Sequence, residues 1–76
     1  MREVPAGVLL VDARGMRCPW PALRLARAMR EAADVLLVAD DPKAGGEVAA
    51  LAAQHGWRVD AAVTADGQAG WQVRRG

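Results

Sequence analysis

The sequence predicts an α/β two-layer sandwich, in which two helices pack on one face of a four-stranded mixed sheet in the order βαβαββ. Two short apolar runs are each followed by a helical pattern, and two alternating segments flank an Asp-Gly turn near the C-terminus. An apolar fraction of 53% is ample for a core. Because 76 residues leave no room for a second core, we expect a single domain spanning 1–76.

The first strand is expected at residues 8–11, before Asp12 and a turn at Gly15. From residue 19 to residue 33 the apolar period becomes helical, which predicts an amphipathic helix. Its inner face would carry Ala22, Leu25, Ala26, Met29 and Ala33.

Residues 35–39 form an uninterrupted apolar run, which predicts a buried second strand. The Asp-Asp-Pro sequence at 40–42 ends it and opens a second helix, weakened at its start by the glycines at 45–46 and stopped by Gly56. The inner side of that helix would carry Val48, Leu51 and Ala52.

Residues 57–63 and 71–74 alternate between apolar and polar side chains, as half-buried strands do. Asp66 and Gly67 between them favour a hairpin. The side chains expected to point inward are Trp57, Val59, Ala61, Val63, Trp71 and Val73.

The composition excludes several classes of protein. With Cys18 as the only cysteine there is no internal disulfide, no CxxC pair and no Cys/His cluster with metal-ligand spacing, and the glycines do not form a phosphate loop. We therefore expect neither a metal nor a cofactor. A net charge of +1 argues against direct binding to nucleic acid. No apolar run approaches the roughly 20 residues that cross a membrane, and the N-terminus lacks a signal-peptide form, which predicts a cytoplasmic protein.

The most informative residue is Cys18, because Pro19 and Pro21 follow it and proline is tolerated in the first turn of a helix. At a helix mouth, free N–H groups and the dipole favour a thiolate, and Arg14 and Arg17 would act in the same direction. We therefore expect the pKa of Cys18 to lie below that of a free cysteine. The alternative is a buried cysteine that acts as a small apolar side chain.

Basic side chains cluster around the thiol, and acidic residues follow later in the chain. Arg24, Arg27 and Trp20 share the outer side of the first predicted helix, which suggests a docking face for a partner protein. Ordinary solvated helix charge is the alternative. Trp20 would either fold back over the first turn or stay exposed as a contact residue.

Residues 10–21, Leu-Val-Asp-Ala-Arg-Gly-Met-Arg-Cys-Pro-Trp-Pro, are similar to the (L/V)DxxGxxCPxP signature of the TusA family of small sulfur carriers, also called SirA-like. Residues 39–42, Ala-Asp-Asp-Pro, resemble its ADDP loop, and the resemblance extends almost from end to end. Glu47-Val48 falls where many members have Asp-Ile. The chain departs from the family at Ala49, where many members have proline, and at Trp57, where many have histidine.

The resemblance implies a sulfurtransferase-type carrier. Cys18 would accept sulfane sulfur as a persulfide from a cysteine desulfurase or a rhodanese-like donor, and Pro19 and Pro21 would hold the helix start. The sulfur would pass to an acceptor protein, in processes such as tRNA thiolation, molybdenum-cofactor maturation or sulfur oxidation. The alternative is a regulatory or protein-interaction module that moves no sulfur. A thiol peroxidase or reductase would lack a resolving cysteine and an evident base.

Four further side chains have expected roles near these motifs. Asp12 would cap or brace the loop before the thiol helix, while Asp40 and Asp41 would cap the second helix. His55 lies near the end of that helix, where a cation suits the dipole, and we expect it to be structural or solvated.

Overall fold

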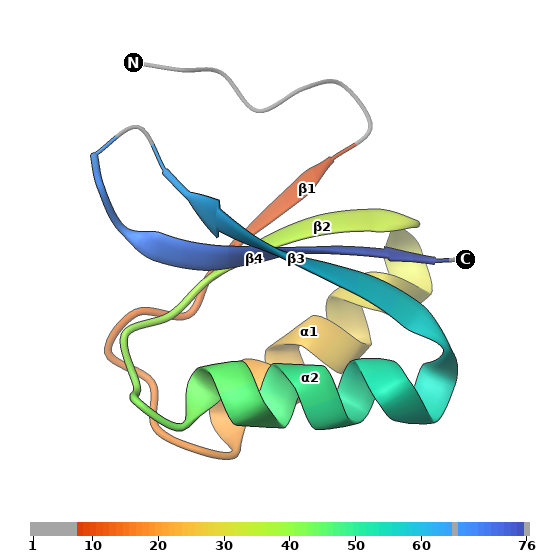
Figure 1. Ribbon diagram of the computed structural model, residues 1–76, viewed down its shortest axis with the longest axis horizontal. Coiled ribbons are helices and arrows are strands. Elements are labelled where there is room, and N and C mark those ends of the chain that lie inside the picture. The colour runs from red at the N-terminus through yellow and green to blue at the C-terminus, as the bar shows by residue number, and fades with distance from the viewer. Residues whose placement is uncertain (1–7, 65, 76) are drawn as a thin grey trace.

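A computed structural model describes residues 8–64 and 66–75 and has the expected order of elements (Figure 1). Its helices and strands are β1 Leu9–Asp12, α1 Trp20–Glu31, β2 Asp34–Val38, α2 Ala44–His55, β3 Trp57–Val63 and β4 Ala69–Arg75. Neither helix in the described ranges is long and apolar enough to cross a membrane.

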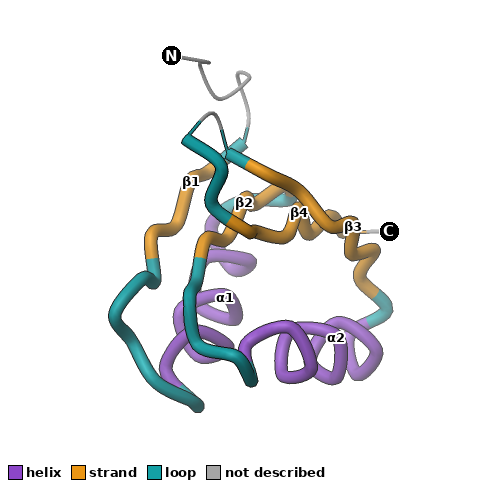
Figure 2. The backbone as a smooth tube through the Cα atoms, turned by 60° about the vertical axis from the view of Figure 1, so that its left-hand side comes forward, coloured by secondary structure: helices purple, strands orange, loops and turns teal. Residues whose placement is uncertain are grey.

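The four strands form one mixed sheet in the order β1-β2-β4-β3. β1 and β2 are parallel, whereas β4 is antiparallel to both of its neighbours. Both helices lie on the same face of the sheet, as Figures 1 and 2 show. Because β1 and β2 are parallel, their C-terminal ends lie at the same end of the sheet. The loop from β1 to α1 therefore lies beside the loop from β2 to α2 (Figure 2).

The core lies between the helices and the sheet and is made of aliphatic side chains, methionine and proline. Its fully buried members of largest volume are Leu25, Met29, Leu37, Val35, Val48, Val73 and Pro21. β2 contributes most from the sheet, which agrees with its uninterrupted apolar run.

Three residues expected to face the core are exposed instead: Ala33, Ala61 and Val63. Ala33 lies beyond the end of α1, so the helical period no longer sets its direction. β3 is an edge strand that rises away from α2 toward its C-terminal end (Figure 1), and Val63 there is 69% exposed. The alternation in β3 therefore continues past the part of the sheet that the helices cover.

The two turn signals at the C-terminal half of the chain are confirmed. Gly56 ends α2 with φ of 71°, the left-handed conformation that favours glycine at a helix end. Between β3 and β4, the backbone N–H of Thr64 donates to the carbonyl of Gln68 at 2.9 Å.

The close contact between β2 and β4 predicts an effect on stability. A Cβ at Gly70 would lie 2.7 Å from the carbonyl oxygen of Leu37, which is backbone and cannot turn aside. Gly70→Ala should therefore lower the free energy of unfolding by about 1–3 kcal/mol, measured by urea denaturation. Gly46→Ala is the control, because a Cβ there meets nothing within 4 Å. That helical substitution should raise the free energy of unfolding by about 0.5–1 kcal/mol. Equal stability of Gly70→Ala and the wild type would contradict the assigned packing.

Candidate functional site

Cys18 lies in the loop between β1 and α1, and its side chain is exposed. Pro19 is the N-cap residue of α1, Trp20 begins the helix, and Pro21 is buried in its first turn. The structure therefore places the thiol at the mouth of α1. It does not support the alternative of a buried cysteine.

Two aspartates from the neighbouring loop hold the backbone of the thiol loop. Asp40 Oδ1 accepts a hydrogen bond from the N–H of Gly15 at 2.9 Å. Asp41 Oδ2 accepts one from the N–H of Cys18 at 2.5 Å, and its Oδ1 accepts one from the N–H of Lys43 at 3.0 Å. These five residues connect the two loops that the parallel strands bring together.

The expectation that Asp40 and Asp41 cap α2 is wrong. The N-cap residue of α2 is Lys43, whose own side chain makes no capping hydrogen bond. Asp40 instead accepts from Gly15 on the facing thiol loop, and Asp41 divides its two oxygens between Cys18 on that loop and Lys43. Hydrogen bonds from Lys43 and Cys18 lower the pKa of Asp41, with a further contribution from the charge of Arg17.

Asp12 braces the thiol loop through Arg14. Its carboxylate accepts hydrogen bonds from the backbone N–H of Arg14 at 3.1 Å and from Nε and Nη2 at 2.9 and 2.8 Å. This contact lowers the pKa of Asp12 to about 2. Arg14 Nη1 also lies 3.6 Å from Asp66 Oδ2. The guanidinium is thus directed at two carboxylates rather than at the thiol, contrary to the expectation that Arg14 favours the thiolate.

The side chain that contacts the thiol is Glu47, from the first turns of α2. Cys18 Sγ donates a hydrogen bond to Glu47 Oε1 at 2.9 Å. In the sequence, Glu47 stands where many members of the family have aspartate, and no role at the thiol was expected for it. The signal for its role is its place at the N-terminal end of a helix that follows the Asp-Asp-Pro loop, but only the folded chain shows that this end faces Cys18.

The pKa of Cys18 is raised, so the expectation of a lowered pKa is wrong. The hydrogen bond to Glu47 is the largest cause, followed by partial removal from solvent and by the negative charges of Glu47 and Asp41. Lys43 acts in the opposite direction and does not outweigh them.

Several of the N–H donors expected at the mouth of α1 are also used or absent. Pro19 and Pro21 have no N–H, the N–H of Trp20 donates to the carbonyl of Arg17 at 2.8 Å, and that of Leu23 donates to the carbonyl of Pro19 at 3.1 Å. The prolines that set the helix start thus remove donors that would have favoured a thiolate.

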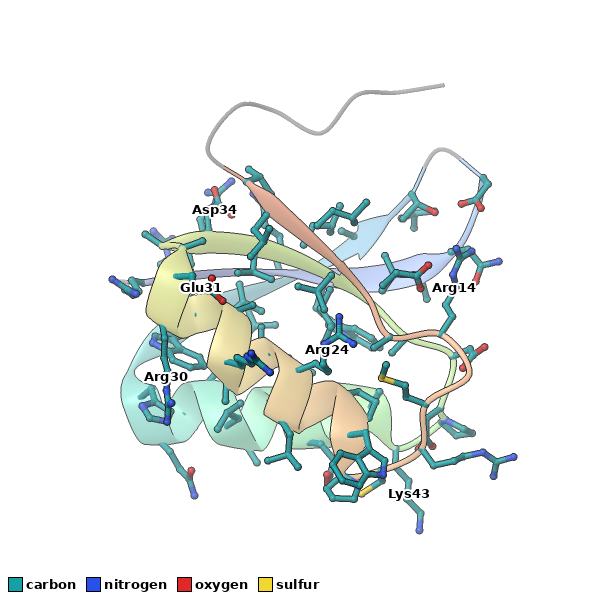
Figure 3. All side chains as sticks on the ribbon, turned by 180° about the vertical axis from the view of Figure 1, so that it is seen from behind. Arg14, Arg24, Arg30, Glu31, Asp34 and Lys43 are labelled. Atoms are coloured by element: carbon teal, nitrogen blue, oxygen red, sulfur yellow. The ribbon has the colours of Figure 1, made fainter. Side chains whose placement is uncertain are left out.

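The three predicted docking residues lie together on the outer side of α1. Trp20 is 59% exposed, so it is not folded back over the first turn. Arg24 and Arg27 are exposed and line a hollow between α1 and β1, together with the strand residues Leu9, Leu10 and Val11. Figure 3 shows Arg24 on this helix and Arg14 on the loop after β1.

His55 lies at the C-terminal end of α2, whereas Glu47 lies near its start. Its ring stacks on that of Trp57, with centroids 4.4 Å apart and planes inclined by 12°. This contact is a structural role, as expected for His55.

The described residues form a small α/β sandwich with an exposed thiol at the mouth of a helix. A family model described as "Sulfurtransferase TusA" matches residues 10–74, so the chain belongs to the TusA family. Membership in this family supports a general sulfur-carrier role and a relay between donor and acceptor proteins.

Comparison with solved structures agrees on the fold. The crystal structure of a SirA-like protein from Desulfitobacterium hafniense matches with a TM-score of 0.75 and 22% sequence identity. The match covers 90% of this chain and 97% of that one. No protein with a curated description matches the sequence.

The site predicts a distinctive pH profile. Since Glu47 favours the protonated thiol, alkylation of Cys18 by iodoacetamide should reach half of its maximal rate above pH 8.5, the approximate pKa of a free cysteine. Below that midpoint the thiol predominates and reaction is slow; above it the thiolate forms and the rate rises. Glutathione measured in parallel is the reference. A midpoint below that of glutathione would show that Glu47 does not control the thiol.

Proposed function

We propose that this protein accepts sulfane sulfur on Cys18 as a persulfide and passes it to a second protein. The observation that carries the proposal is the exposed thiol of Cys18, with its backbone N–H held by Asp41, in a chain of the TusA family. An accessible sulfur on a fixed loop is the main requirement of thiol–persulfide exchange.

The transfer needs no oxidant or reductant beyond the reacting sulfurs. On loading, Cys18 sulfur loses its proton and attacks the terminal sulfur of a donor persulfide, the donor S–S bond breaks, and the donor leaves as a thiolate that takes up a proton. On delivery, an acceptor thiolate attacks the terminal sulfur held by Cys18, and Cys18 is the leaving thiolate. Because Cys18 is the only cysteine, no second thiol of the chain can attack the persulfide and release sulfide.

The donor we propose is a cysteine desulfurase or a rhodanese-like protein, and the acceptor is a protein with a reactive cysteine. Candidate destinations are tRNA thiolation, molybdenum-cofactor maturation and sulfur oxidation. All of them require a partner whose cysteine reaches Cys18.

Trp20, Arg24 and Arg27 form the docking face that we propose for these partners. Trp20 follows Cys18 by two positions, and both arginines lie on the same helix with exposed side chains. Within residues 8–64 and 66–75, neither arginine takes part in an ion pair, so their charges are available to acidic groups of a partner.

Sulfur loading should depend on Cys18. Incubation with a desulfurase and cysteine, or with a rhodanese and thiosulfate, should add one sulfur to the wild-type mass. Cys18→Ser should gain none, because a hydroxyl forms no persulfide. Intact-protein mass spectrometry makes the measurement. If wild type gains no sulfur from either donor, the chain acts as an interaction module instead.

Charge reversal of the docking face should separate docking from chemistry. The double variant Arg24→Glu/Arg27→Glu should load at least several-fold more slowly from a protein donor at low salt, and the difference should shrink as salt rises. Loading from inorganic polysulfide needs no docking and should be nearly unchanged. Arg58→Glu is the control, since β3 and β1 form opposite edges of the sheet. Equal impairment with both sulfur sources would refute the docking face.

A further inference from the structure

Acidic groups lie close to the carrier sulfur, and they come from outside its own loop. Glu47 on α2 accepts the hydrogen bond from Sγ at 2.9 Å, while Asp41 holds the backbone N–H of the same residue. The cation that counteracts them at Cys18 is Lys43 at the start of α2. Arg17, on the thiol loop, acts on Asp41, and Arg14 is paired with Asp12. At Cys18 the negative charges of Glu47 and Asp41 therefore outweigh the positive charge of Lys43.

Building on the proposed function, we propose that Glu47 is a further catalytic residue, whose carboxylate contacts the reacting sulfur and favours its protonated form both as the empty thiol and as the loaded persulfide. The hydrogen bond of the empty state is present in the structure. The raised pKa of the thiol agrees with it.

The same carboxylate also acts on the loaded state, because the transferred sulfur stays close to Glu47. The terminal sulfur of a persulfide lies one S–S bond, about 2.05 Å, beyond Sγ. Since Sγ itself is 2.9 Å from Glu47 Oε1, the terminal sulfur remains within the range at which like charges disfavour each other. A persulfide anion at this position is therefore destabilised relative to the neutral form.

The neutral form suits a carrier that must deliver its sulfur. A persulfide anion is a nucleophile that reacts with disulfides and other electrophiles, whereas the terminal sulfur of the neutral persulfide is open to attack. In delivery, an acceptor thiolate forms the new S–S bond, the bond to Cys18 Sγ breaks, and its electron pair stays on Cys18. Cys18 then takes a proton from water and restores its hydrogen bond to Glu47. The carboxylate thus favours delivery to thiols and suppresses side reactions.

Glu47→Gln tests the proposal, because the amide keeps the size of the side chain and removes its charge. Glu31→Gln is the matched control. Glu31 is the last residue of α1 (Figure 3), whereas Cys18 lies before the first residue of that helix. Glu47→Asp retains a carboxylate and should stay closer to wild type than Glu47→Gln. Unfolding midpoints of all three variants identify any loss of fold.

The first measurement is iodoacetamide alkylation of the empty protein as a function of pH. Glu47→Gln should shift the midpoint to lower pH. A shift of one unit raises the thiolate fraction at neutral pH about tenfold and lowers the reactivity of each thiolate about threefold, for a net gain of about threefold in rate. Glu31→Gln should follow the wild-type profile.

The second measurement uses protein loaded with inorganic polysulfide. In Glu47→Gln, alkylation of the persulfide by iodoacetamide should become faster at neutral pH, while delivery of sulfur to free cysteine should become slower. Both are followed by mass, since an alkylated persulfide is one sulfur heavier than an alkylated thiol. Opposite changes in the two rates are the signature of a shift in protonation, which a merely structural role would not produce.

Two failures are distinguishable. If wild type takes up no sulfur, the proposed function itself is wrong. If wild type and Glu47→Gln both load normally and their pH profiles coincide, the role of Glu47 is overturned while sulfur carriage stands. The same conclusion follows if Glu31→Gln shifts the pH profile as far as Glu47→Gln does. Faster thiol alkylation with unchanged persulfide reactions would also overturn the proposal, because the carboxylate would then not act on the cargo.

Discussion

The hydrogen bonds from the thiol loop to the Asp40–Asp41 pair are the contacts on which the site depends. They exist because β1 and β2 are parallel neighbours, so that the loops after both strands meet at one edge of the sheet. Each carboxylate accepts from a backbone N–H that no helix or strand satisfies, and such charge-assisted bonds are stronger than neutral ones. The position of Cys18 is thus set by the loop between β2 and α2 as well as by its own loop between β1 and α1.

The same arrangement decides the chemistry of the thiol. A cysteine before a helix is usually expected to be a stabilised thiolate. Here the prolines remove donors from the helix mouth, and the fold supplies Glu47 as the partner of the sulfur. The result is a thiol that is accessible yet protonated at rest. For a carrier this is a useful combination, because an idle thiolate would react with any disulfide or oxidant it met.

Much of the fold follows from the sequence because its signals are local. The apolar run of β2, the glycine that ends α2 and the Asp-Gly hairpin each act over a few residues, and their order leaves few ways to build a sheet. The exposure of Ala61 and Val63 was not predictable from alternation, since the pattern does not say how far the helix layer extends. The prediction that Ala33 faces the core was wrong for a similar reason, because α1 ends before this residue.

The site was predictable only in part. The motif around Cys18 locates the thiol, and the pairing of Asp12 with Arg14 could have been inferred from their separation by two residues. The contact between Cys18 and Glu47 spans 29 positions and exists only in the folded chain. Because that contact reverses the expected direction of the pKa shift, local reasoning about the helix mouth gave the wrong sign.

The most direct test of the account is a relay of isotopically labelled sulfur. A desulfurase supplied with heavy-sulfur cysteine would load this protein, which would then be separated and mixed with an acceptor protein bearing a reactive cysteine. The account predicts that heavy sulfur leaves Cys18 and appears on the acceptor in equal amount, with no release of sulfide. Label that stays on Cys18, or that reaches the acceptor equally fast from the desulfurase alone, would contradict it.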